Sequence, residues 1–158
     1  MILIGYQGIG KSTLAYKNNN YIDLESSNFY HNDKRPDNWY IYYCNIATSL
    51  SIQGFDIFVS SHEVVRNRLK KYNKITTPIY CIYPSLELKH DWIKKLEDRY
   101  NKDKNEKNYK AWMNAVDRYE ENILEIMNSG FGNIEITSMY YNLENLIDNY
   151  VRRILNNG

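Results

Sequence analysis

Short apolar runs alternate along this chain with segments in which apolar residues recur every three to four positions. A short apolar run bounded by polar or turn residues is typical of a buried strand, and the longer periodicity is typical of a helix. The runs predict strands at 1–4, 21–23, 55–59, 78–82 and 134–136. The periodic segments predict helices at 11–17, about 38–52, up to about 72, from 84, after 110 and from about 143. This alternation predicts an α/β fold whose parallel sheet is covered by helices on both faces.

Polar residues at the ends of these segments predict where the helices begin and end. Asp37 is expected to cap the helix from about residue 38, and Gly54 to terminate it. Ser60 and Glu63 have the spacing of a capping box, which predicts a helix start there. The apolar positions of the later helices are expected to face the core: Leu88, Trp92, Ile93, Leu96, Trp112, Met113, Val116, Tyr119, Ile123, Met127, Leu143, Leu146, Ile147, Tyr150, Val151 and Ile154.

Length, charge and cysteine content narrow the class of protein. The 158 residues suit one domain, and a net charge of +1 gives no global basic surface for a long nucleic acid. Cys44 and Cys81 lie among apolar neighbours and are expected to be buried free thiols. The first strand begins at Met1 without a preceding secretion signal, and no apolar run reaches membrane-spanning length. We therefore expect a cytoplasmic protein with no membrane contact, and the heavy use of Asn, Lys, Ile and Tyr suggests a low-GC bacterium or its phage.

The strongest motif follows the first apolar run. Residues 5–12 read Gly-Tyr-Gln-Gly-Ile-Gly-Lys-Ser, which fits the phosphate-binding pattern G-x-x-x-x-G-K-[ST]. Glycines let the backbone turn its N–H groups toward phosphate oxygens, and the following helix directs its N-terminus at the same anion. Lys11 is expected to reach the β- and γ-phosphates and Ser12 to offer its hydroxyl to Mg²⁺. The predicted ATP-binding residues are Gly8, Ile9, Gly10, Lys11, Ser12 and Thr13.

A second polar group follows the second strand, at the sheet edge where ligands of parallel α/β proteins bind. Asp23 ends that strand, which we expect to neighbour the first one. Its carboxylate is a candidate to accept a proton from the phosphate acceptor, or to hold Mg²⁺ through water, although Asp is also common in turns. Glu25, Ser26 and Ser27 are candidates for the acceptor site.

The third strand ends in Val59-Ser60-Ser61-His62, without the Walker B aspartate expected there. Asp56 lies at the opposite end of the strand, too early to reach the metal. Either Asp23 supplies the carboxylate near Mg²⁺, or Ser12, phosphates and water hold the ion. Ser61 and His62 are further candidates for contact with the acceptor or the γ-phosphate.

Several arginines and lysines are candidates to neutralise the negative charge of phosphate groups or of an anionic acceptor. Residues 94–110 are rich in lysine and connect two predicted helices, which favours a lid that brings Arg99 over the transferred phosphoryl group. Arg118 is an alternative, and a solvated charged surface is the simpler reading of the stretch. Arg35 is a candidate to bind an anionic acceptor. Trp39 and Tyr40 either stack on a base or, more simply, pack their helix.

These residues resemble the small P-loop kinases, which include the nucleoside monophosphate kinases, shikimate kinase and gluconate kinase, together with similar uncharacterised phage and Gram-positive proteins. The resemblance covers most of the chain in layout and is specific at residues 5–13 and 21–27, with Arg99 a further match. It implies a three-layer α/β/α P-loop NTPase fold, a sheet ordered 2-3-1-4-5, ATP with Mg²⁺, and a short helical lid. It also implies an acceptor held by the segments after strands 2 and 3. The Asp-Gly-x-Pro-Arg segment of adenylate kinases is absent after the third strand, and the lid has fewer arginines than theirs.

Three functions are compatible with this pattern. The first is an ATP-dependent kinase in which Lys11, Asp23 and Arg99 act on a small acceptor such as a nucleoside or nucleotide. The second is a kinase acting on a modified base in DNA, which the near-neutral charge disfavours. The third is a nucleotide-binding regulatory protein with little turnover, suggested by the missing aspartate after the third strand.

Overall fold

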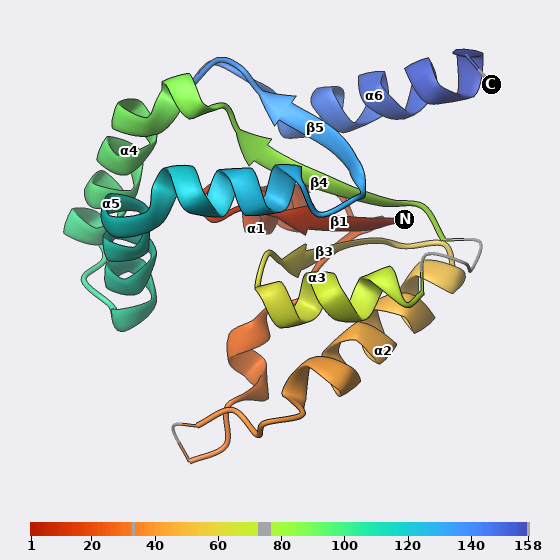
Figure 1. Cartoon of the computed structure of the whole chain (residues 1–158), viewed down its shortest axis with the longest axis horizontal. Coiled ribbons are helices and arrows are strands. Elements are labelled where there is room, and N and C mark those ends of the chain that lie inside the picture. The colour runs from red at the N-terminus through yellow and green to blue at the C-terminus, as the bar shows by residue number, and fades with distance from the viewer. Residues whose placement is uncertain (33, 73–76, 158) are drawn as a thin grey trace.

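The computed structural model describes residues 1–32, 34–72 and 77–157. Their central element is a five-stranded, all-parallel sheet with the strand order β2-β3-β1-β4-β5 (Figure 1), which confirms the expected α/β class and strand order. The strands are β1 (Ile2–Gly5), β2 (Tyr21–Asp23), β3 (Asp56–Ser60), β4 (Ile79–Pro84) and β5 (Gly132–Ile136).

Helices cover both faces of the sheet (Figure 1). Helices α3 (Glu63–Lys70) and α5 (Glu106–Met127) lie over one face, and α2 (Trp39–Ile52) packs beside α3. Helices α1 (Lys11–Lys17) and α6 (Leu143–Asn157) lie on the opposite face. Helix α4 (Lys89–Lys102) forms a hairpin with α5 beyond the carboxyl ends of the strands. Two short 3₁₀ helices, η1 (Ser26–Phe29) and η2 (Leu86–Leu88), precede α2 and α4.

The strand residues are apolar on both sides because both faces of the sheet are covered. Ile2, Leu3 and Ile4 of β1 pair with Ile57, Phe58 and Val59 of β3, and all six side chains are buried. The two cysteines are buried free thiols, as expected. Within the described residues, no helix is long and apolar enough to cross a membrane.

Two predicted helix caps are wrong. Helix α3 begins at Glu63 with His62 as its N-cap residue, because Ser60 remains in β3, where it is paired with Gly5. Helix α2 begins at Trp39, close to the predicted start, but its N-cap residue is Asn38 and not Asp37. The predicted end of α2 is confirmed, since Gly54 has a φ of 99° just after the helix.

Two residues predicted to face the core are exposed instead. Val116 lies on the outer side of α5, two residues before a kink at Arg118, whose φ of −137° is not helical. Ile154 lies in the last turns of α6, which extend past the edge strand β5 and so have no sheet to cover (Figure 1). Trp92 and Leu96 of α4 are almost completely buried, as expected.

Candidate functional site

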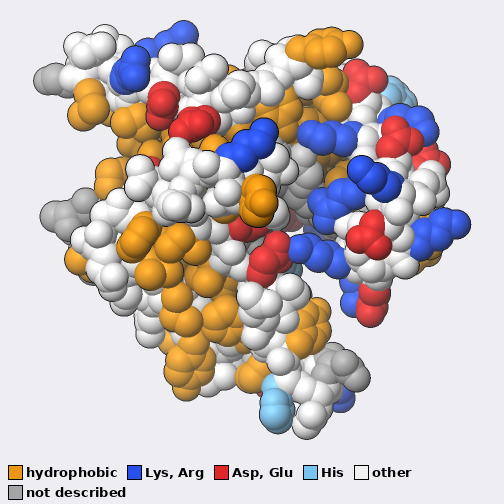
Figure 2. Space-filling model, turned by 180° about the vertical axis from the view of Figure 1, so that it is seen from behind, with side chains coloured by type: hydrophobic (Ala, Val, Ile, Leu, Met, Phe, Trp, Pro, Cys, Tyr) orange, Lys and Arg blue, Asp and Glu red, His pale blue; other side chains and the backbone are white. Residues whose placement is uncertain are grey.

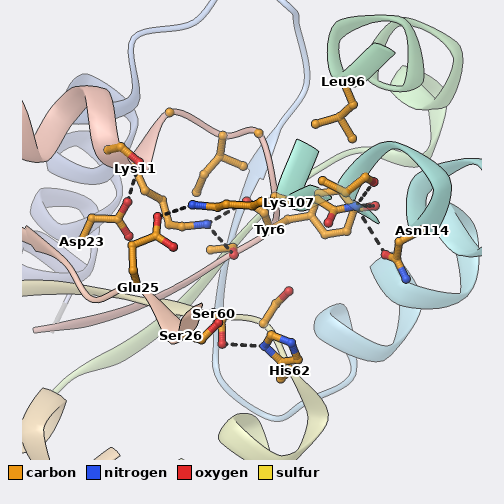
Figure 3. A pocket seen from close by; sticks show the side chains of 18 of the residues that line it. Tyr6, Lys11, Asp23, Glu25, Ser26, Ser60, His62, Leu96, Lys107 and Asn114 are labelled. Carbon is orange, nitrogen blue, oxygen red and sulfur yellow. Dashed lines mark hydrogen bonds and ion pairs between the residues drawn. The ribbon is translucent and has the colours of Figure 1, made fainter. Parts of the chain in front are cut away.

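A cleft of about 1610 Å³ opens at the carboxyl ends of the strands, between the sheet and the α4–α5 hairpin (Figure 3). This edge is where parallel α/β proteins bind their ligands. The structure brings every residue proposed for the site to the wall of this one cleft. These residues are Gly8, Ile9, Gly10, Lys11, Ser12, Thr13, Asp23, Glu25, Ser26, Arg35, Ser61 and Arg99.

Residues 5–12 form a glycine-rich loop between β1 and α1. Gly8 and Gly10 have φ angles of 83° and 101°, a region that residues with a side chain rarely occupy. The Lys11 ammonium donates to the carbonyls of Gly5 and Tyr6 over 3.3 and 3.4 Å. Burial lowers the pKa of Lys11, while the nearby carboxylates of Asp23 and Glu25 oppose this effect. The loop thus holds a desolvated cation that faces two acids across the cleft.

Helix α4 presses directly on this loop. A Cβ atom added to Gly8 would lie 3.0 Å from Leu96 Cδ2 and 3.3 Å from Trp92 Nε1. The Trp92 indole N–H also donates to the Gln7 carbonyl over 3.0 Å. Glycine is therefore needed at position 8 both for its backbone angle and for the close approach of α4.

Asp23 contacts Ser12, the residue that follows Lys11 in the glycine-rich loop motif. The Ser12 hydroxyl donates to Asp23 Oδ2 over 2.6 Å. The expectation that β2 neighbours β1 is wrong, because β3 lies between them. Asp23 still reaches Ser12, since α1 leads straight into β2 and packs against it. Burial raises the pKa of the Asp23 carboxyl, and the Ser12 hydrogen bond and the Lys11 charge partly oppose that rise.

Ser12 and Asp23 together fit a magnesium ion bound through a nucleotide. Their hydroxyl and carboxylate oxygens are the hard ligands that Mg²⁺ prefers. In the described part of the chain, no group of three or more His, Cys, Asp or Glu side chains could hold a metal by itself. Mg²⁺ in nucleotide sites takes one or two protein ligands and completes its shell with phosphates and water, so a two-residue site matches that usage.

The segments after β2 and β3 form the wall opposite the α4–α5 hairpin. Glu25 forms an ion pair with Lys107 of α5, with 2.7 Å between Glu25 Oε1 and Lys107 Nζ (Figure 3). Tyr43 of α2 joins the two segments, because its hydroxyl donates to the Leu24 carbonyl over 2.6 Å and accepts from the Ser60 N–H over 2.8 Å. The buried side chain of Tyr43 therefore links the two segments through these two hydrogen bonds.

Ser60, Ser61 and His62 occupy the end of β3 where the sequence lacks an aspartate. His62 Nδ1 lies 2.7 Å from Ser60 Oγ. Desolvation within the cleft, together with the cations Arg35, Lys11 and Arg66, lowers the pKa of His62 to about 4. The imidazole is therefore neutral at ordinary pH and offers one donor and one acceptor.

Arg35 also lines the cleft, where it packs on two aromatic rings. Its guanidinium lies 4.8 Å from the Tyr30 ring centre and 4.5 Å from the Trp39 ring centre, and it donates to the Tyr30 hydroxyl over 3.1 Å. Trp39 is buried among Phe29, Tyr43 and His62, so its packing role is confirmed. Tyr40 likewise packs against the core.

The predicted lid, residues 94–110, comprises the second half of α4, the turn and the start of α5, so it includes the tip of the α4–α5 hairpin and part of its buried base. Arg99 Nε donates to Asn108 Oδ1 over 2.6 Å, and buried Asn108 also donates to the Asp103 carbonyl. Arg99 thus braces the turn while it lines the cleft. Arg118, the alternative, pairs with Glu121 over 2.6 Å and lies 3.5 Å from Glu125.

Several cleft residues carry no local signal in the sequence. Arg66 is buried, donates to the Ser61 carbonyl and pairs with Glu125 over 3.1 Å. Lys95, Lys107 and Tyr141 also line the cleft or its surroundings through contacts that span long stretches of sequence. Lys95 and Lys107 could be suspected only as members of a lysine-rich run.

Positive charge predominates in the cleft. Its lining includes nine lysines and arginines against six acidic residues, whereas the chain as a whole has a net charge of only +1. Lysine and arginine side chains gather on the α4–α5 hairpin and on the side of the hollow beside it (Figure 2). The cleft is thus suited to anionic ligands.

No model of a known protein family matches this chain, and no curated protein matches it at a significant level.

Proposed function

We propose that this chain has a P-loop kinase fold and transfers the γ-phosphoryl group of ATP to a small acceptor, a nucleoside or nucleotide. The observation that carries the proposal is the convergence of Lys11, Ser12 and Asp23 at one glycine-rich loop, where the Ser12 hydroxyl lies 2.6 Å from the Asp23 carboxylate. The positively charged lining and the strand order 2-3-1-4-5 support it.

The glycine-rich loop holds the phosphates of ATP in this proposal. The left-handed backbone at Gly8 and Gly10 allows successive N–H groups to face one anion. The Lys11 ammonium exchanges its present acceptors, the Gly5 and Tyr6 carbonyls, for phosphate oxygens, which are stronger partners for a desolvated cation. Mg²⁺, bound by Ser12 near Asp23, neutralises phosphate charge when it is present.

The acceptor lies between the segments after β2 and β3, which Tyr43 holds together. Its nucleophilic oxygen attacks the γ-phosphorus, the bond from that phosphorus to the bridging oxygen breaks, and ADP leaves. When the nucleophile is a hydroxyl, Asp23 takes its proton; the burial that raises the Asp23 pKa makes this carboxylate a better base. Glu25, Ser26, Ser61 and neutral His62 supply hydrogen bonds to the acceptor, and Arg35 supplies a cation at the far end.

The test is incubation with ATP labelled at the γ-phosphate and separate pools of nucleosides, nucleoside monophosphates and duplex DNA containing hydroxymethylated bases. Label transferred to a nucleoside or nucleotide supports the proposal, with Lys11→Ala as the control that abolishes it. Label on DNA alone identifies the DNA-base kinase instead. ATP binding without transfer to any pool identifies a regulatory protein, and an absence of ATP binding overturns the assignment.

A further inference from the structure

Lys95 of α4 is a lysine held in a fixed position by two aromatic rings. Its Nζ lies 4.3 Å from the Trp92 ring centre and 5.2 Å from the Tyr141 ring centre, and it donates to the Tyr141 hydroxyl over 3.2 Å. The two rings are stacked, with centres 6.2 Å apart and planes 19° from parallel. Such contacts restrict a side chain that is otherwise among the most flexible.

Both rings are attached to the glycine-rich loop. The Trp92 indole donates to the Gln7 carbonyl over 3.0 Å, and the Tyr141 hydroxyl donates to the Ile9 carbonyl over 2.8 Å. These hydrogen bonds enclose Gly8, the residue on which α4 presses. Lys95 is thereby linked through Trp92 and Tyr141 to residues 7 and 9 of the loop, whereas Lys11 contacts the carbonyls of residues 5 and 6 directly.

The charge of Lys95 is not balanced inside this arrangement. The side chain is partly buried, and both that burial and nearby Arg99 lower its pKa. Across residues 1–32, 34–72 and 77–157, no carboxylate forms an ion pair with it. Its exposed neighbour Lys94 differs, since it pairs with Asp98 over 2.6 Å and with Glu97 over 3.4 Å. Lys95 lines the cleft beside the glycine-rich loop. A partly desolvated cation at this position would be stabilised by an anionic ligand.

We propose that Lys95 is a second phosphate-binding cation, which contacts the phosphate chain of the nucleotide beside residues 7–9 of the loop. This inference rests on the proposed function and names a residue that it does not use. Because Trp92 and Tyr141 hold Lys95 and are themselves hydrogen-bonded to the loop, this cation is in place before the tip of the α4–α5 hairpin moves. Arg99, which is hydrogen-bonded to Asn108, is then not the first cation of the hairpin to meet the phosphates.

Calorimetric titration of Lys95→Gln with Mg·ATP, tripolyphosphate and adenosine tests this role. We expect the affinity for Mg·ATP and tripolyphosphate to fall about 10- to 100-fold, the usual effect of losing a charge-assisted hydrogen bond, while the response to adenosine stays that of the wild type. Lys94→Gln is the matched control, because it removes the adjacent charge from the outer face of the same helix, and it should change the affinity less than twofold. Lys95→Arg should retain most of the affinity.

A structural role for Lys95 predicts a different result. If Lys95→Gln lowers the melting temperature but binds tripolyphosphate as the wild type does, the inference is overturned and the lysine only packs on the rings. Lys95→Met, which keeps the aliphatic stem on Trp92 and Tyr141, provides the same comparison if the glutamine variant does not fold. Failure of the wild type to bind ATP or tripolyphosphate would overturn the proposed function itself, whereas wild-type binding with an unaffected variant overturns only the role of Lys95.

Discussion

The hydroxyl of Ser12 donates to the carboxylate of Asp23 over 2.6 Å, and this contact links the glycine-rich loop to the end of β2. It passes over β3, which separates β2 from β1 in the sheet and carries serines where a carboxylate would be expected. The carboxylate that contacts Ser12 therefore comes from the end of β2 and not from the end of β3. The contact also gives Asp23 two possible roles, as a base for the acceptor or as a group that orients the metal ligand Ser12.

Asp23→Asn separates these two roles. The substitution keeps the shape of the side chain and removes its charge, so ATP binding should persist while transfer falls about 10²- to 10⁴-fold, the usual contribution of a general base. Steady-state and single-turnover kinetics at several Mg²⁺ concentrations measure the loss. If excess Mg²⁺ restores part of the rate, Asp23 acts mainly through the metal. Unchanged turnover per folded molecule would contradict both roles and direct attention to Glu25 or Ser61.

Lys11→Ala should leave the fold intact and sharply reduce ATP binding or transfer. The Lys11 ammonium donates to the carbonyls of Gly5 and Tyr6 and the side chain lines the cleft, so the substitution removes no side chain of the hydrophobic core. Circular dichroism and thermal unfolding report the fold, and calorimetry reports nucleotide affinity. Wild-type affinity and turnover in this variant would remove the basis of the proposed function.

Gly8→Ala should destabilise the protein and also weaken nucleotide binding. The φ of 83° costs about 1–2 kcal/mol for a residue with a Cβ atom. The new methyl group would in addition lie 3.0 Å from Leu96 Cδ2 and 3.3 Å from Trp92 Nε1, so these side chains of α4 must shift by a few tenths of an ångström. Gly130→Ala is a matched control, since Gly130 has a φ of 84° and, among the described residues other than its chain neighbours, no heavy atom lies within 4 Å of an added Cβ.

The two alanine variants therefore share the backbone cost and differ in the steric one. Denaturant unfolding should show a larger loss for Gly8→Ala than for Gly130→Ala, and only the former should change the affinity for Mg·ATP. Equal losses of stability and unchanged nucleotide binding would mean that the contact between α4 and the loop is not required.

The parts of the site that the sequence predicted are those defined by local spacing. Residues 5–12 and Asp23 follow directly from a motif and from the end of an apolar run, so their position at the sheet edge follows once the strands are parallel. Ser60 shows the limit of such reasoning. It has capping-box spacing with Glu63, yet the pairing of β3 with β1 keeps it in the strand.

Other parts depend on contacts between distant segments, which a single sequence does not display. Tyr43 resembles any core aromatic of α2, and only the fold shows that its hydroxyl joins Leu24 to Ser60. Lys95 and Lys107 belong to one charged run, but Lys95 donates to Tyr141 beside the glycine-rich loop, whereas Lys107 pairs with Glu25. The position of each lysine around its helix and the geometry of the α4–α5 hairpin determine which partner it meets.

The tip of the α4–α5 hairpin should be more mobile than its base in the absence of ligands. Trp92 and Leu96 are buried at the base, whereas residues 101–107 are exposed. The Lys107–Glu25 pair is one contact that holds the tip over the cleft, and both of its partners are substantially exposed, so it contributes little stability. We expect hydrogen exchange at 99–110 to be fast in the free protein and to slow when nucleotide and acceptor bind together.

Glu25→Gln tests that contact. It should increase exchange at 99–110 in the free protein by no more than about fivefold, because an exposed ion pair is worth at most about 1 kcal/mol, and it should leave the strands unchanged. Glu106→Gln is the control, because Glu106 pairs within α5, with Lys110. Protection of 99–110 at the level of the core strands, with and without ligands, would show a static surface in place of a lid.

His62 should remain neutral down to unusually low pH. Desolvation and the cations Arg35, Lys11 and Arg66 lower its pKa to about 4 in the folded protein, while the unfolded chain has the ordinary value near 6.5. Between these two values the unfolded state binds the proton and the folded state does not. Titration of His62 therefore does not affect stability above pH 6.5, and it lowers the free energy of unfolding progressively as the pH falls toward 4. His62→Gln removes this pH-dependent effect, so the free energy of unfolding of the variant should decrease less than that of the wild type between pH 7 and pH 4.5.

An NMR titration measures the pKa of His62 directly, with its resonance assigned by its loss in the variant. A midpoint near 6.5 would show that the cleft does not hold this imidazole neutral.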